Sequence, residues 1–272
     1  MNNNTIIENE QIIYINSRNR YSQNESHSDF SFFIDLNHDV DYTHVILLNC
    51  SIPKSFYNVQ KNSSFTLTEG LNSVIINVPP SNYSRTSFKN VVQQLLNNNS
   101  PNNYQYTITF QNINTIGDDG KLTYTVSGVN INDEQPIFTF NNSLFELFGF
   151  DKNKSYQFTS NILRSTNVCN MNKESTLFLR SNIVQNKNNN ILHDIISFSD
   201  PSYSYIIYEC NGNIIENAKT FSRDRSNVYR FWLTNEDDDR IDLNGLNIIF
   251  KIMVFKLTKL KTLEQLIEKK NN

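Results

Sequence analysis

Short apolar segments separated by turn residues recur along almost the whole chain of 272 residues. In two clear examples, Tyr104–Phe110 and Leu122–Val126, apolar or aromatic residues alternate with threonine and glutamine. This alternation predicts strands with one buried face, and the sequence Gly117-Asp-Asp-Gly120 between them predicts a turn. Because the strands do not alternate with long helices, a parallel α/β fold is disfavoured. The pattern favours an antiparallel all-β sandwich or barrel.

The chain can be divided into expected elements by the period of its apolar residues. Helical spacing predicts helices over 86–97, 143–149 and 258–272, and the polar residues 1–10 are expected to form a loose N-terminal arm. The expected strands are 11–16, 29–36, 43–52, 63–68, 73–78, 104–111, 121–127, 137–140, 155–159, 175–182, 191–198, 203–210, 227–234 and 246–257.

Composition narrows the classes of function. Aromatic residues make up 12% of the chain, which favours strands. The net charge is -3 and the basic residues are scattered apart from the C-terminal tail, so direct nucleic-acid binding is not expected. No apolar run reaches about 18 residues, so no membrane span is expected. The cysteines and histidines lack metal-ligand spacing, and neither a metal nor a cofactor is expected.

Three segments near the N-terminus occur in a recognisable order. They are Tyr14–Arg20 (YINSRNR), Asp29–Leu36 (DFSFFIDL) and Thr43–Asn58, which ends in IPKSFYN. Together they resemble the N-terminal part of penton-type minor capsid proteins, which occur in virophages, in Polinton-like and adinto-like viruses and in related large DNA viruses.

The resemblance continues over most of the chain. The later matching segments are Tyr83–Leu96, Tyr104–Val126, Leu144–Phe150 (LFELFGF), Ser175–Val184, Ile191–Ile196 and Tyr229–Gly245. Each motif is weak alone, and the ordered set is more specific. The stretch 161–174 and the tail 258–272 have no place in this family pattern.

The resemblance implies a jelly-roll sandwich over 11–257, with 81–160 as an inserted segment or as the upper half of an elaborated jelly roll. It implies a structural virion protein without enzymatic activity, which forms homopentamers at the vertices of an icosahedral capsid. The implied partners are the major capsid protein and other minor capsid proteins. The implied location is the virion, assembled in the host cytoplasm or a virus factory.

Two groups of residues are candidates for a subunit interface. The first consists of arginines in polar turns, which suit salt bridges to a neighbouring subunit. The second is the apolar stripe of the tail, which is too short to form a stable helix alone and must dock on its own domain or on a neighbour. The candidates are Arg18, Arg20, Arg223, Arg225, Leu260, Leu263, Leu266 and Ile267.

Other interpretations of the sequence stay open. The protein could be an attachment or fibre-head domain that binds a host receptor or glycan, or a minor cement protein. A carbohydrate-active jelly roll would need two facing carboxylates, for which Glu209 and Asp194 fit by residue type only. The acidic run 236–239 could hold calcium, although a solvated hairpin turn fits better. Trp232 could anchor an interface, although packing in the core is favoured.

Overall fold

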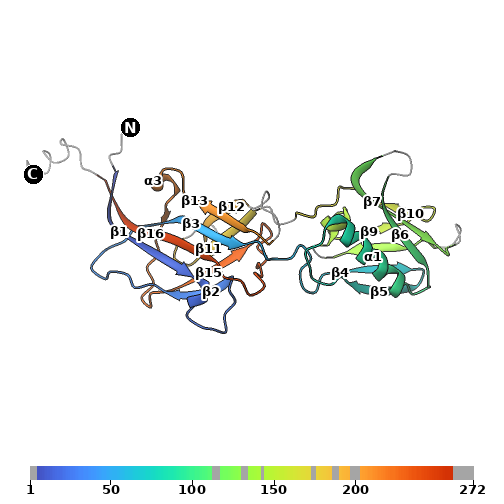
Figure 1. The fold of residues 1–272 in the computed structure, drawn as a ribbon, viewed down its shortest axis with the longest axis horizontal. Coiled ribbons are helices and arrows are strands. Elements are labelled where there is room, and N and C mark those ends of the chain that lie inside the picture. The colour runs from blue at the N-terminus through green and yellow to red at the C-terminus, as the bar shows by residue number, and fades with distance from the viewer. Residues whose placement is uncertain are drawn as a thin grey trace, which may run out of the picture. The chain divides into compact units, whose positions relative to one another are not determined.

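The computed structural model describes residues 5–111, 117–129, 134–141, 144–172, 176–185, 190–196 and 203–259. The chain divides into two compact units (Figure 1). Unit 1 combines Met1–Phe56 with Glu174–Asn272, and unit 2 is the intervening Tyr57–Lys173. Both units consist mainly of antiparallel strands, so the predicted all-β class is confirmed. Among the described residues, no helix is long and apolar enough to cross a membrane.

Unit 1 contains two packed sheets. Sheet A has the strand order β1-β16-β3-β13, with β14 also paired to β3, and sheet B has the order β12-β11-β15-β2. The elements are β1 (Thr5–Asn16), η1 (Ser17–Asn19), β2 (Asp29–Phe33), β3 (His44–Pro53), β11 (Thr176–Ser181), β12 (Ile191–Ile196), β13 (Tyr205–Glu209), α3 (Ile214–Asn217), β14 (Lys219–Thr220), β15 (Val228–Thr234) and β16 (Ile249–Lys259).

The strand order of unit 1 is that of a jelly roll. With the two-residue β14 set aside, eight main strands remain. Numbered along the chain, they run 1-8-3-6 in sheet A and 5-4-7-2 in sheet B. This interleaving of two four-stranded antiparallel sheets is the jelly-roll arrangement. The predicted jelly roll is therefore confirmed, and unit 2 is inserted between its third and fourth main strands.

Alternation along the strands builds the core of unit 1. In β15, Tyr229, Phe231 and Leu233 are buried in the core between the two sheets, while Arg230 is exposed on the outer face. Phe231 packs on Phe250 of β16 with ring centroids 5.1 Å apart. Burial of such side chains from both inner faces drives the sandwich to close.

Unit 2 has two smaller sheets of its own, with orders β5-β4-β8-β9 and β10-β7-β6, and α1 packs against β6 and β5. Ser84 and Ser87 cap the first turn of α1 reciprocally. The elements are β4 (Ser64–Glu69), β5 (Asn72–Asn77), α1 (Arg85–Asn99), β6 (Gln105–Gln111), β7 (Asp118–Ser127), β8 (Ile137–Phe140), α2 (Phe145–Phe148), β9 (Lys154–Gln157) and β10 (Ile162–Arg164).

Unit 2 has a separate core dominated by aromatic rings. Phe138 is fully buried and contacts Tyr124 edge-on at 5.3 Å and Phe158 at 5.2 Å between ring centroids. Phe88 of α1 reaches the same core and meets Phe148 at 5.1 Å. Edge-to-face contacts of this kind add to the stabilisation from burial alone.

Several boundaries differ from those predicted. Residues 5–10, expected to be a loose arm, are part of β1: residues 5–8 pair with the end of β16, from Thr5 opposite Lys259, and 9–10 lie where the register shifts. Because β16 continues to Lys259, residues 258 and 259 belong to a strand, and 260–272 lie outside the described residues. The stretch 81–160 lies inside unit 2, which extends beyond it at both ends. On the N-terminal side it includes β4 and β5, which lie in one sheet with β8 and not in the sheets of the jelly roll.

Candidate functional site

Arg18 and Arg20 lie at the turn that follows β1. Arg18 is exposed in η1. The guanidinium of Arg20 donates to the backbone carbonyl oxygens of Ser17 at 3.3 Å and Gln23 at 3.0 Å. Arg20 therefore holds this turn together, whereas the exposed Arg18 is the one better placed for a partner.

Arg223 and Arg225 lie in the connection that leads into β15. Arg223 donates to the backbone carbonyl oxygens of Val40 at 2.9 Å and Asn37 at 3.4 Å. It thereby ties this connection to the one between β2 and β3, while Arg225 is exposed. The four candidate residues of the tail, from Leu260 onward, lie outside the described residues.

Trp232 lies on the outer face of sheet B and is not part of the core. Its ring lies beneath two guanidinium groups, those of Arg240 at 4.8 Å and Arg230 at 5.8 Å from the centroid. Both arginines also pair with Asp29 of β2, Arg230 in a bidentate manner at 2.7 and 2.8 Å and Arg240 at 3.4 Å. Two cations thus share one carboxylate over a half-exposed indole.

This arrangement could have been found in the sequence. In a strand, residues two apart share a face, so Trp232 must lie on the same face as the charged Arg230 and opposite Phe231. The prediction that Trp232 packs in the core rested on the residue type and did not use the alternation of strand residues. Trp and Arg are the residues most enriched at interface hot spots, so the cluster of Asp29, Arg230, Trp232 and Arg240 is a candidate interaction surface.

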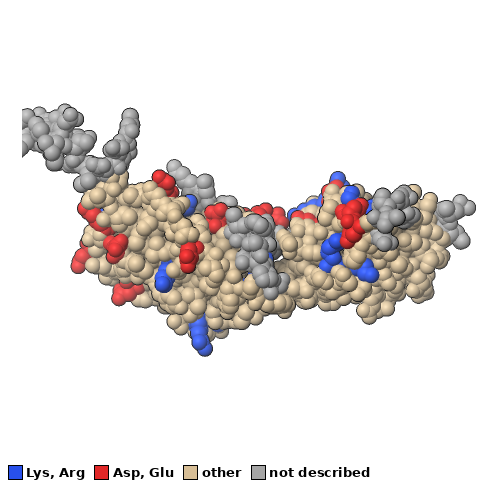
Figure 2. Space-filling model, turned by 45° about the horizontal axis from the view of Figure 1, so that its top comes forward, with Lys and Arg blue, Asp and Glu red and all other residues tan. Residues whose placement is uncertain are grey.

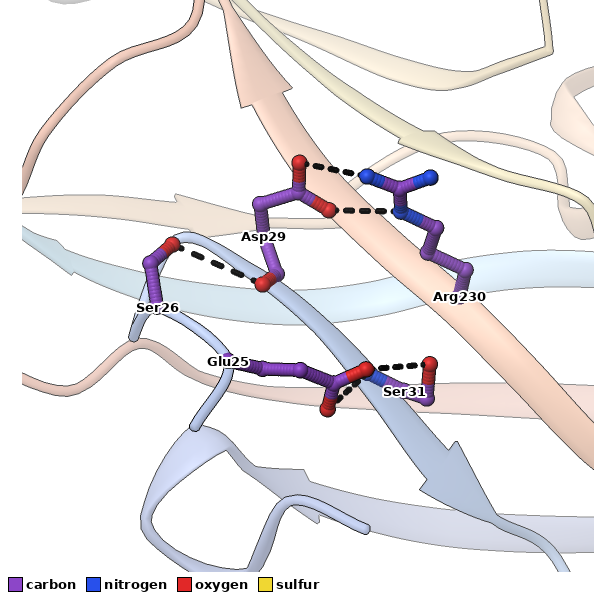
Figure 3. Close-up of a pocket in the computed structure, with 5 residues that line it drawn as sticks. All are labelled: Glu25, Ser26, Asp29, Ser31 and Arg230. Atoms are coloured by element: carbon purple, nitrogen blue, oxygen red, sulfur yellow. Dashed lines mark hydrogen bonds and ion pairs between the residues drawn. The ribbon is translucent and has the colours of Figure 1, made fainter. Parts of the chain in front are cut away.

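A shallow hollow of about 340 Å³ borders this cluster and is lined by Glu25, Ser26, Asp29, Ser31 and Arg230 (Figure 3). The carboxylate of Glu25 accepts hydrogen bonds from the Ser31 hydroxyl at 2.7 Å and the Ser31 amide at 2.9 Å. Because the carboxylates of Glu25 and Asp29 are both engaged by their neighbours, the hollow is a rigid polar surface. This chemistry suits binding better than acid–base catalysis.

The acidic run 236–239 forms a compact turn on unit 1. The side-chain oxygen of Asn235 accepts from the amides of Asp237 at 3.0 Å and Asp239 at 2.8 Å. The carboxylate of Asp238 pairs with Arg180, whose guanidinium also donates to Thr234 at 2.8 Å. Among the residues that the structure describes, no group of three or more histidine, cysteine or acidic side chains is placed to hold a metal.

The carboxylates considered for glycoside hydrolysis belong to different sheets. Asp194 lies on β12 of sheet B, Glu209 lies on β13 of sheet A, and both are exposed. Between these strands His193 packs on Tyr208, with ring centroids 4.1 Å apart. Burial lowers the pKa of His193 below its usual range. This part of unit 1 is therefore a packed junction between the edges of two sheets.

The cysteines are free thiols, Cys50 and Cys169 buried and Cys210 half-buried. Burial raises the pKa of Cys169 to about 11, and the pKa of the fully buried Cys50 lies even further above its usual range. Thiols with such pKa values stay protonated at neutral pH and are poor nucleophiles. Cys50 and Cys169 therefore act as small core residues.

Unit 2 carries a charged patch of its own. Arg85 pairs with Asp118 at 2.8 and 2.9 Å and lies 4.5 Å from the ring centroid of Phe110. Arg164 pairs with Asp119, and each arginine holds the pKa of its aspartate below the usual range. In Figure 2, basic and acidic side chains lie next to one another on the face of unit 2 that is turned to the viewer. Charge is thus locally balanced there, which does not favour a nucleic-acid surface.

Two solved structures of viral proteins are similar to this chain over most of its length. No protein-family model matches the sequence, and no curated protein matches it. The chain is similar to the mavirus penton protein, with a TM-score of 0.46 and 11% identity, covering 91% of this chain and 100% of that one. It is also similar to a chain of the Sputnik virophage, with a TM-score of 0.41 and 12% identity, covering 90% of this chain and 97% of that one.

Proposed function

We propose that the protein is a structural component of a viral capsid and, within the capsid, the penton protein that forms its pentameric vertices. The observation that carries the proposal is the jelly-roll strand order of unit 1, found where the ordered sequence motifs resemble penton-type proteins. The fold alone does not fix a function, because jelly rolls also serve lectins and enzymes. The motif set and the fold together favour the capsid role.

A pentameric vertex requires a closed ring of identical subunits. Identical subunits close a ring when one surface of each meets a different surface of the next and the rotation is a fraction of a full turn. Arg18, Arg225 and the cluster around Trp232 are the exposed candidates on unit 1 for such contacts. We propose the major capsid protein and other minor capsid proteins as the further partners, and the virion as the location.

The mass of the purified protein in solution tests the proposal, measured by light scattering or native mass spectrometry at several salt concentrations. The expected result is a pentamer, which weakens with added salt if charged contacts contribute. A stable trimer that binds glycans would contradict the penton role and favour an attachment head. In purified virions, labelling of the chain at positions other than the vertices would favour a cement role.

A further inference from the structure

The outer face of sheet A carries exposed apolar side chains at its β1 edge. Ile12 is 60% exposed and Tyr14 is 53% exposed. Because their neighbours Ile13 and Ile15 fill the core, Ile12 and Tyr14 lie on the opposite, outer face of the sheet. Two large apolar residues side by side on an edge strand favour contact with another surface.

The middle of this face is already covered, whereas Tyr205 and Ile207 of β13, at the opposite edge, are 58% and 61% exposed. Ile12 pairs with Met253 of β16, which is only 4% exposed and forms a small apolar cluster with Ile46 and Phe255. Residues from 210–218, including Ile214 of α3, pack against this cluster. The chain therefore covers the middle of the outer face and leaves its β1 edge open.

The C-terminal segment 260–272 has the right length and pattern for this open edge. It follows directly after Lys259, and its leucine and isoleucine residues recur at helical spacing from Leu260 to Ile267. A helix of this length would span about 20 Å at 1.5 Å per residue. The outer-face positions of β1 from Ile7 to Tyr14 extend over about 20 Å as well, at roughly 3.3 Å per residue with one bulge.

The sequence before the segment disfavours its folding back onto its own sheet. Lys259 is still paired with Thr5, and the apolar stripe begins at the very next residue. A reversal needs a turn of about four residues, usually with Gly, Pro, Asn or Asp, and 256–263 (KLTKLKTL) contains none of these. The sequence of 256–263 therefore favours a surface other than its own sheet as the partner of the segment.

We propose that segment 260–272 of one copy docks on the outer face of β1 of a second copy, with Ile12 and Tyr14 as its anchors. The contact is heterologous, since tail and sheet edge are different surfaces, and this is the type of contact that closes a ring. The inference rests on the proposed function, because it assumes that copies of the chain assemble. It specifies which segment of one copy contacts which surface of the next.

Disulfide trapping between two variants, each with one engineered cysteine and the buried Cys50 and Cys169 retained, tests this contact. One variant carries Ile12→Cys, the other Leu263→Cys, and both carry Cys210→Ser to remove the half-buried thiol. After mixing and mild oxidation, a covalent dimer containing both variants is expected. In the matched control, Ile207→Cys replaces Ile12→Cys, because Ile207 is 61% exposed on the outer face of β13 at the opposite edge of sheet A. The control should give no dimer.

Two results would overturn the inference. One is the absence of a mixed dimer while native mass spectrometry of the same sample shows pentamers, which leaves the penton role standing. The other is a disulfide within one chain when Ile12→Cys and Leu263→Cys are combined, which places the tail on its own sheet. A sample without pentamers and without the dimer would contradict the penton role as well.

As a second measurement, the double variant Ile12→Ser with Tyr14→Ser should weaken association between copies at least tenfold. Since both positions are exposed, the variant should fold.

Discussion

Adjacent residues of β15 lie on opposite faces of sheet B, one in the core and one on the outer face. Substitutions at the two positions should therefore change the free energy of unfolding by different amounts. Phe231→Ala removes a fully buried ring and should lower the free energy of unfolding by about 3–5 kcal/mol. Trp232→Ala removes a larger, half-exposed ring and two cation–π contacts, and should cost only about 1–2 kcal/mol. Urea denaturation followed by circular dichroism measures both. A larger loss for Trp232→Ala would contradict its place on the outer face.

Histidine burial predicts how stability depends on pH. Burial lowers the pKa of His193 in the folded protein, with Asp194 acting in the opposite direction and Lys219 in the same direction. Below the unfolded pKa of about 6.5, the unfolded chain takes up a proton that the folded chain resists. Stability should therefore fall as the pH drops from 6.5 toward the lowered pKa of the folded state. Burial lowers the pKa of His44 as well, so this histidine contributes in the same direction.

The variant His193→Gln should lose less stability than the parent protein between about pH 7 and pH 5, the range in which histidine titrates. Urea midpoints at the two pH values measure the difference. His38→Gln is the matched control, because His38 is exposed in a loop of the same unit. An unchanged pH dependence in His193→Gln would show that burial does not lower the pKa of His193 in the folded protein.

At the scale of elements, a buried carboxylate joins two strands and a helix of unit 2. Glu69, at the end of β4, is 0% exposed. Its carboxylate accepts from the Tyr106 hydroxyl at 2.7 Å, the Ser100 hydroxyl at 2.8 Å and the Asn102 amide at 2.8 Å. These donors lie on β6 and just after α1, so a single side chain fixes the position of both elements.

Glu69→Ala should therefore destabilise unit 2 by about 3 kcal/mol, because it leaves three donors without their acceptor. Glu216→Ala, at an exposed position of α3, is the control and should stay within about 0.5 kcal/mol of the parent. Both values come from denaturant unfolding. A neutral Glu69→Ala would mean that water replaces the carboxylate.

Elements with a strong periodic pattern could be predicted from the sequence, and short elements could not. The alternation in Tyr104–Phe110 and the stripe from Phe88 to Leu96 reappear as β6 and α1. The strands β10 and β14 have three and two residues, too few to show a period. The start of β1 was missed because Thr5–Glu10 has no clear alternation and is fixed by pairing with β16, 250 residues away in the chain.

At the scale of the whole molecule, the two cores should respond separately to substitution. Phe138→Ala should destabilise unit 2 by about 3–5 kcal/mol, because the ring is central to that core. The only tryptophan, Trp232, belongs to unit 1. Its fluorescence should therefore report an unfolding transition that Phe138→Ala leaves unchanged, while the far-ultraviolet circular dichroism transition shifts. Equal shifts in both signals would show that the two units unfold together.

The sequence suggested the jelly roll and the inserted segment, yet the border between the units could not be read from it. Alternating residues such as Phe65 and Leu67 of β4 face the aromatic core of unit 2, while Val45 and Leu47 of β3 face the core of unit 1. In both strands, these side chains at every second position face a core. Only the pairing of distant strands decides which core each one serves.

The position of β16 has a consequence for the synthesis of the protein. This strand is the last one described in the chain, yet it lies between β1 and β3 in the interior of sheet A. A ribosome must reach the end of β16 before β1 can find its partner, whereas unit 2 is complete much earlier. A prematurely terminated chain lacks the strand that joins β1 to β3. Only chains that include β16 can then close the jelly roll, which guards assembly against products truncated before this strand.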